Sequence, residues 1–180
     1  MKGIIFTEFM ELVEDQFGLD VLDEVLAMSQ DEGIYTSVGS YDHRSLVKLI
    51  VNLSKKTDID AETLQQVFGR SVFKSLLASI PLDASLIESS GTFQFIKHVE
   101  TYIHVEVKKL YPEASPPTFN FISEGESKMT LDYQSARCMS HVCFGLIKGC
   151  ADYFDEEIDI SMESISDDDN LVRFNLTKVA

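Results

Sequence analysis

A single histidine, His104, lies in the segment TYIHVEVKKLYP, among valines, an isoleucine and a leucine. Apolar residues recur at helical spacing over residues 91–111, which predicts an amphipathic helix there. At about 100° per residue, His104 falls on the same side as Phe93 and Ile96, so we expect its imidazole to be buried. A buried imidazole needs a partner. If His104 is considered alone, its expected hydrogen-bond partner is a backbone carbonyl or a carboxylate, because single histidines seldom bind metals.

Heme iron is the main exception, because the porphyrin supplies four nitrogens and one neutral imidazole can bind from one side. A heme also carries two carboxylates, which call for fixed donors. The segment YQSAR offers Tyr133, Ser135 and Arg137 at alternate positions, and on an extended chain these share one face. Taken alone, this short pattern is better explained as the solvent face of a strand that ends in a salt-bridged arginine.

Two kinds of structure must position these residues. Helical spacing predicts a first half made of helices, over residues 3–16, 20–29, 43–57, 60–80 and 91–111. After the linker PEASPP, apolar residues alternate in two predicted hairpins, TFNFISEG with SKMTLDYQS and EEIDISMESI with NLVRFNLTKV. A predicted helix over residues 136–154 lies between these hairpins.

Helices that come first and strands that come later predict an α+β fold, with an N-terminal helical subdomain followed by a mainly antiparallel sheet and a long helix. The length suits one domain over residues 1–180. We expect its helical part to reach about residue 111 and its sheet-containing part to cover about 112–180.

The charge of the chain excludes several classes of partner. Its 30 acidic and 15 basic residues give a net charge of −15, which repels nucleic acids and anionic membranes. No apolar run approaches the ~18 residues of a membrane span, and the first residues do not resemble a signal peptide. Cys138, Cys143 and Cys150 fit a reducing cytoplasm better than a disulfide framework. With His141 they form two pairs on different helix faces, so we favour core thiols over a zinc site.

In combination, HVEVKKLYP, the proline pair at 116–117 and Y-x-S-x-R resemble the heme nitric oxide/oxygen binding (H-NOX) family, related to the sensor domain of soluble guanylate cyclase. The opening MKGIIF, the length and the order of helices and strands extend the resemblance to nearly the whole chain. It implies a heme b (protoporphyrin IX iron) buried between the two parts. The implied residues are a proximal ligand at His104, a propionate clamp at Tyr133, Ser135 and Arg137, and a porphyrin-distorting proline at Pro117.

The resemblance also implies a distal pocket above the iron. Its six positions in this chain are all apolar: Ile5, Phe9, Val72, Leu76, Val142 and Leu146. Members that hold O2 have a tyrosine where this chain has Val142. A hydroxyl stabilises the superoxide character of bound O2 by about 1.5–3 kcal/mol, whereas NO and CO gain far less. We therefore predict a sensor for NO, and also CO, that disfavours O2. His141 adjoins Val142, and one helical step should carry it out of the pocket.

The family implies a sensor and not an enzyme: NO weakens the bond between iron and His104, and a separate signalling protein reads the new conformation. A histidine kinase or a cyclic-di-GMP enzyme is the expected partner. The alternative from another class is a cofactor-free acidic adaptor domain, with His104 in its core and Arg137 in a salt bridge. A peroxidase-type heme enzyme would need a distal acid–base residue, and none of the six distal positions supplies one.

Overall fold

The computed structural model describes residues 1–79, 89–103, 109 and 115–179. Its helices in the first half are α1 (Gly3–Phe17), α2 (Leu19–Ser29), α3 (His43–Thr57), α4 (Ala61–Ser79) and α6 (Thr92–His98), which continues as the π-helix η1 (Val99–Ile103). The second half contains β1 (Thr118–Glu124), β2 (Lys128–Gln134), α8 (Ser140–Tyr153), β3 (Ile158–Ser164) and β4 (Leu171–Lys178). The predicted α+β class and the order of its elements are confirmed.

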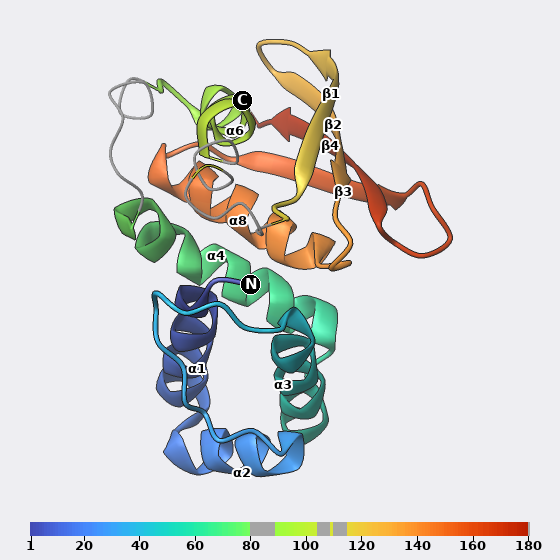
Figure 1. The fold of residues 1–180 in the computed structure, drawn as a ribbon. Coiled ribbons are helices and arrows are strands. Elements are labelled where there is room, and N and C mark those ends of the chain that lie inside the picture. The colour runs from blue at the N-terminus through green and yellow to red at the C-terminus, as the bar shows by residue number, and fades with distance from the viewer. Residues whose placement is uncertain (80–88, 104–108, 110–114, 180) are drawn as a thin grey trace.

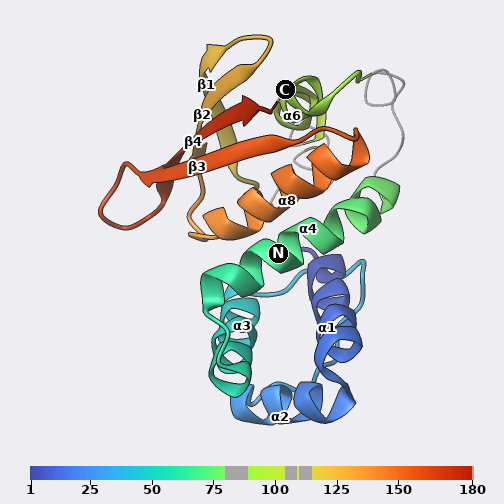
Figure 2. The same cartoon turned by 180° about the vertical axis from the view of Figure 1, so that it is seen from behind.

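Helix α4 lies between the first three helices and the rest of the molecule. Figures 1 and 2 show α1, α2 and α3 on one side of α4, with α8 and then the sheet on the other. The four strands run in the order β1-β2-β4-β3, and every neighbouring pair is antiparallel. Within the described residues, no helix is both long enough and apolar enough to cross a membrane.

The starts of α1 and α3 are fixed by contacts that satisfy their first backbone N–H groups. Asp42 caps α3, because its carboxylate accepts from the backbone N–H of Arg44 at 2.9 Å. The loop before α3 completes the start of α1, since the N–H groups of Gly3 and Ile4 donate to the carbonyls of Gly39 and Ser37. These contacts hold the N-terminal end of α1 in place beside the site described below.

Buried side chains form two large clusters, one on each side of α4 and α8. Phe6, Leu46 and Phe68 belong to the helical cluster. Leu131 and Phe174 belong to the sheet cluster, which also takes in Phe93 and Ile96 of α6. Helix α6 therefore packs with the sheet, although it precedes the strands in the sequence.

Most predicted boundaries differ from the structure by one or two residues, and larger differences lie in the helix expected over 91–111 and at the start of α8. The single regular helix expected over 91–111 is α-helical only to His98 and then π-helical, and the residues after Ile103 include many outside the described part. A π-helix rotates by less than 100° per residue. The helical projection that was used to predict the buried side of the segment therefore holds only up to His98. Strand β2 ends at Gln134, and α8 begins at Ser140 where the sequence predicted residue 136.

Candidate functional site

A cavity of about 560 Å³ lies between the helical cluster and the sheet, a size within the usual range of ligand pockets. Residues of α1, α3, α4, α6, η1, α8 and the first two strands line it. Most of its wall is hydrocarbon, as in Phe73, Leu77, Phe95, Val99 and Ile147. A wall of this kind holds a ligand with a large apolar surface.

Four of the six predicted distal residues line this cavity: Ile5, Leu76, Val142 and Leu146. The other two, Phe9 and Val72, are not among its lining residues. Each is 1% exposed and packs inside the helical cluster, where the Phe9 ring lies 5.3 Å from that of Phe68. The predicted set is thus divided between the cavity wall and the layer that supports it.

The segment YQSAR reaches the cavity at its polar end. Tyr133 and Arg137 line the cavity, and so does Pro117. Ser135 is not among the lining residues. It lies 6% exposed behind them, and its hydroxyl accepts from the backbone N–H of Arg137 at 3.2 Å. The N–H of Cys138 donates to the carbonyl of Ser135, so residues 135–138 form a turn and not the extended chain that the sequence suggested.

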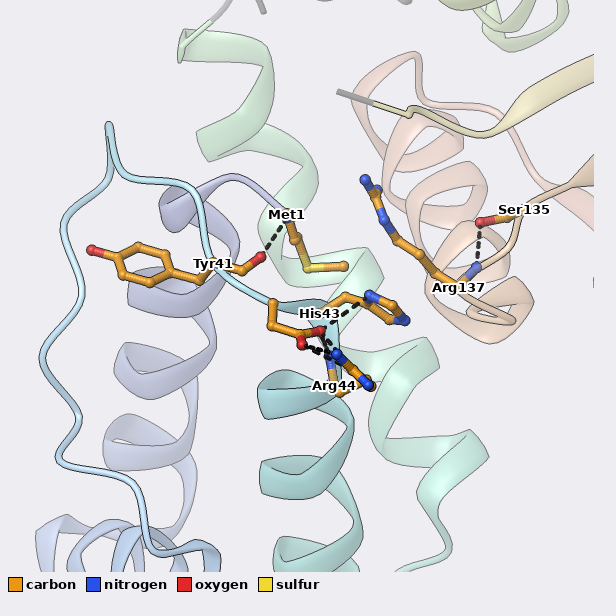
Figure 3. A network of polar contacts seen from close by, with 7 residues as sticks. Met1, Tyr41, His43, Arg44, Ser135 and Arg137 are labelled. Carbon is orange, nitrogen blue, oxygen red and sulfur yellow. Dashed lines mark hydrogen bonds and ion pairs between the residues drawn. The ribbon is translucent and has the colours of Figure 1, made fainter. Parts of the chain in front are cut away.

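The guanidinium of Arg137 brings positive charge to this end of the cavity. In Figure 3 its side chain extends away from Ser135, on the side where Met1 lies. Burial first, and then Arg137, lower the pKa of the Met1 amino group. Among the described residues, no carboxylate lies within ion-pair distance of Arg137. A guanidinium beside an apolar cavity favours an anion there, and carboxylates suit its fork best.

Tyr133 adds an uncharged donor next to Arg137. Its side chain is buried between the rings of Phe119 and Phe174, each 6.0 Å away between centroids. Burial raises the pKa of Tyr133, so its hydroxyl keeps its proton at neutral pH. A phenol and a guanidinium at one end of an apolar cavity can together donate to carboxylates.

His104, the predicted iron ligand, lies outside the described residues. The segment that leads to it is described: Ile96 and Val99 line the cavity, and η1 ends one residue before His104. His141, which precedes Val142 on α8, is not among the residues that line the cavity. Its Nδ1 lies 2.9 Å from Nε2 of Gln66, on α4.

Many lining residues were not in the predicted site, and two of them carry thiols. Cys143 and Cys150 of α8 both border the cavity, where the sequence indicated only core thiols. Burial raises the pKa of Cys143 to about 12 and also raises that of Cys150, so both are neutral thiols at pH 7. Their spacing of seven residues places them on one helix face, which was the available signal.

The residues present fit a heme. The cavity offers an apolar wall for the porphyrin and a guanidinium with a phenol for its carboxylates. A model of the family described as Haem-NO-binding matches residues 2–162. The chain belongs to the haem-NO-binding family.

Solved structures of this family, named H-NOX, resemble the chain over nearly its full length. The unliganded Fe(II) H-NOX protein of K. algicida has 36% identity and a TM-score of 0.91, over 100% of this chain and 97% of that one. The H-NOX of Shewanella woodyi, bound to IWP-051 in the Fe(II)CO state, has 40% identity and a TM-score of 0.81, over 99% and 95%.

An H-NOX protein of S. oneidensis in the Fe(II)NO state shares the fold, with 24% identity and a TM-score of 0.86 over 100% of both chains. A comparison with curated proteins gave no match.

Proposed function

We propose that this H-NOX chain is a heme gas sensor that binds NO, and also CO, and disfavours O2. The observation that carries the proposal is the apolar cavity with Arg137 and Tyr133 at one end. The resemblance to the Fe(II) protein of K. algicida and the CO-bound protein of S. woodyi supports it.

The cofactor in this proposal is heme b, whose ferrous iron supplies the site that binds a diatomic gas. His104 holds the iron from the proximal side. Arg137 and Tyr133 donate to the propionates, while Ser135 orients Arg137 by accepting from its backbone N–H at 3.2 Å. Pro117 packs against the porphyrin from the cavity wall.

Selectivity follows from the distal side chains of the chain itself. Ile5, Leu76, Val142 and Leu146 put no donor into the cavity, and Phe9 and Val72 support them from behind. Without a hydroxyl, bound O2 loses a hydrogen bond to charge worth about 1.5–3 kcal/mol, and NO loses little. The apolar wall therefore favours NO.

In this proposal His104 would link the heme to the rest of the chain, and gas binding would loosen that link. The helix that leads to His104 is then free to move against the sheet, and a separate protein recognises the changed surface. A histidine kinase or a cyclic-di-GMP enzyme fits this role. The chain acts as a sensor and carries out no catalysis of its own.

Absorption spectroscopy of the purified protein tests the proposal. A Soret band is expected after expression or after reconstitution with hemin. In the reduced protein, NO should shift this band and air should not. A protein that stays colourless after reconstitution contradicts heme binding and favours the adaptor alternative.

The assignment of the ligand needs a separate variant. His104→Gly should lose protein-derived axial ligation and regain a five-coordinate ferrous spectrum with added imidazole. His98→Ala, six residues earlier in the sequence, is the matched control and should keep the native spectrum. If His104→Gly also keeps it, another residue binds the iron.

A further inference from the structure

The segment between α2 and α3, which passes along the outer side of α1 (Figures 1 and 2), exposes two large apolar side chains. Ile34 is 73% exposed and Val38 is 81% exposed, the highest values for large apolar residues in the described part of the chain. No residue from 33 to 41 is charged. At about 3.3–3.6 Å per residue, the two Cα atoms lie at most about 14 Å apart, so one partner surface can cover both side chains.

The loop that carries these side chains is held firmly on α1, by aromatic rings as well as by the backbone hydrogen bonds at the start of that helix. The Tyr35 ring stacks on the buried Phe6 ring with centroids 4.5 Å apart, and the Tyr41 ring meets that of Tyr35 edge-on at 4.7 Å. The hydroxyl of Tyr41 accepts from the backbone N–H of Thr36 at 2.9 Å. Because the loop is already ordered, a partner that covers its apolar side chains loses little binding energy to loop ordering.

The part of the chain around this loop is strongly acidic. Residues 1–42 contain ten acidic residues and one basic residue, so they carry −9 of the net charge of −15. Exposed carboxylates on α1, on α2 and in the loop itself belong to Glu11, Glu14, Asp15, Asp20, Asp23 and Glu32. A surface of one sign attracts a partner of the opposite sign and discriminates against others. Apolar side chains in acidic surroundings are therefore complementary to an apolar face flanked by lysines and arginines.

We propose that residues 33–41 form a docking loop for a partner protein, in which Ile34 and Val38 contact an amphipathic segment with basic flanks. The docking loop also reaches the cavity, because Ser40 lines it and pairs with Lys2, a second lining residue, in an isolated β-bridge. A partner on this loop thus lies beside the rim of the cavity. The inference rests on the proposed function and deepens it, since it gives the signalling protein a surface to bind.

The test uses the heme-loaded protein and a labelled synthetic helix of leucine and lysine, which has an apolar face and basic flanks. Fluorescence anisotropy of the label measures the Kd. The same helix with glutamate in place of lysine is the charge control. Ile34→Ser combined with Val38→Ser is the loop variant. Val67→Ser combined with Ile122→Ser is the matched control variant, because these side chains are 49% and 48% exposed on α4 and β1.

The leucine–lysine helix should bind the native protein, and its Kd should rise about tenfold or more in the loop variant, because two aliphatic side chains no longer become buried on binding. The control variant should bind it with the native Kd. The leucine–glutamate helix should bind the native protein at least about tenfold more weakly than the leucine–lysine helix, because its charge has the wrong sign.

Three results overturn the docking loop: a native Kd in the loop variant, an equal loss in the control variant, or no binding of the leucine–lysine helix by the native protein. Equal binding of the leucine–glutamate helix overturns the basic partner.

Two further results assign the loop to another occupant and overturn the proposal as well. One is a native dimer in sedimentation that the loop variant abolishes, which indicates a second copy of the chain. The other is binding to phosphatidylcholine vesicles that the loop variant abolishes, which indicates a lipid surface. All these outcomes concern docking alone, whereas a native protein without a Soret band overturns the proposed function itself.

Discussion

Gly69 of α4 and Gly145 of α8 face one another where the two helices cross, so closely that a Cβ atom on Gly145 would lie 2.8 Å from the Cα atom of Gly69. The same atom would lie 2.1 Å from the carbonyl oxygen of Gln66. These contacts are backbone and cannot be relieved by turning a side chain. Because Leu76 and Leu146 line the cavity from these two helices, the crossing sets the distance between two of its walls.

Gly145→Ala should therefore force α4 and α8 apart. Overpacking of this kind costs about 1–3 kcal/mol in the free energy of unfolding, measured by urea titration. Val67→Ala is the control on α4, since Val67 is 49% exposed and its truncation should change stability by less than about 0.5 kcal/mol. Equal stability of Gly145→Ala and the native protein would mean that the helices can separate freely.

Local patterns of the sequence predicted most of the fold. The alternation in TFNFISEG and SKMTLDYQS placed β1 and β2 within a residue or two, because one face of each strand packs on a core. Helical spacing over residues 43–57 predicted α3 from its first to its last residue. Such signals depend only on neighbours along the chain, so they can be read without the tertiary structure.

What the sequence did not predict depends on contacts between distant segments. The π-helical turn of η1 and the turn at residues 135–138 interrupt the regular patterns, and we found no sequence signal for either of them. Phe9 and Val72 have the same residue types as the lining residues, and only the packing of α1 on α4 sets them behind the wall. The residue types predicted that the site is apolar. The structure shows which of these residues line the cavity and which pack behind the lining residues.

Replacing Arg137 should weaken the hold on heme. Arg137→Ala removes the guanidinium at the cavity, and a charged hydrogen bond of about 1.5–3 kcal/mol corresponds to roughly 10- to 150-fold faster heme dissociation. Arg137→Lys should recover part of the loss, since it restores the charge without the fork. Heme transfer to apomyoglobin, followed by absorbance, measures the rate.

Arg44→Ala controls for the loss of a nearby positive charge. Arg44, labelled in Figure 3, is 82% exposed, is not among the residues that line the cavity, and forms an ion pair with Asp42. Its replacement should leave heme dissociation at the native rate. Equal rates for Arg137→Ala and the native protein would show that the propionates are held elsewhere.

Asp42 should make stability depend on pH in a window at acid pH. Hydrogen bonds from the side chain and then the backbone of Arg44 lower the pKa of Asp42 from 3.8 to about 2. A lowered pKa in the folded state adds stability above the unfolded value, and this stability is lost as the pH falls from about 4 to about 2. Asp42→Asn keeps a capping oxygen but not the charge. Its Tm should be below native at pH 6, and the gap should narrow toward pH 2.5, as followed by circular dichroism. If the difference in Tm between Asp42→Asn and the native protein does not change with pH, the pH dependence of stability does not come from Asp42.

Val142→Tyr should convert the cavity into one that holds O2. Val142 lines it from α8, and a tyrosine there adds a hydroxyl that can donate to bound O2. A gain of about 1.5–3 kcal/mol corresponds to roughly 10- to 150-fold tighter O2 binding, measured by titrating the reduced protein with O2 and recording its visible spectrum. Val142→Phe adds the same ring without the hydroxyl and should not bind O2. If both variants bind it equally, the added ring and not the hydroxyl controls ligand choice.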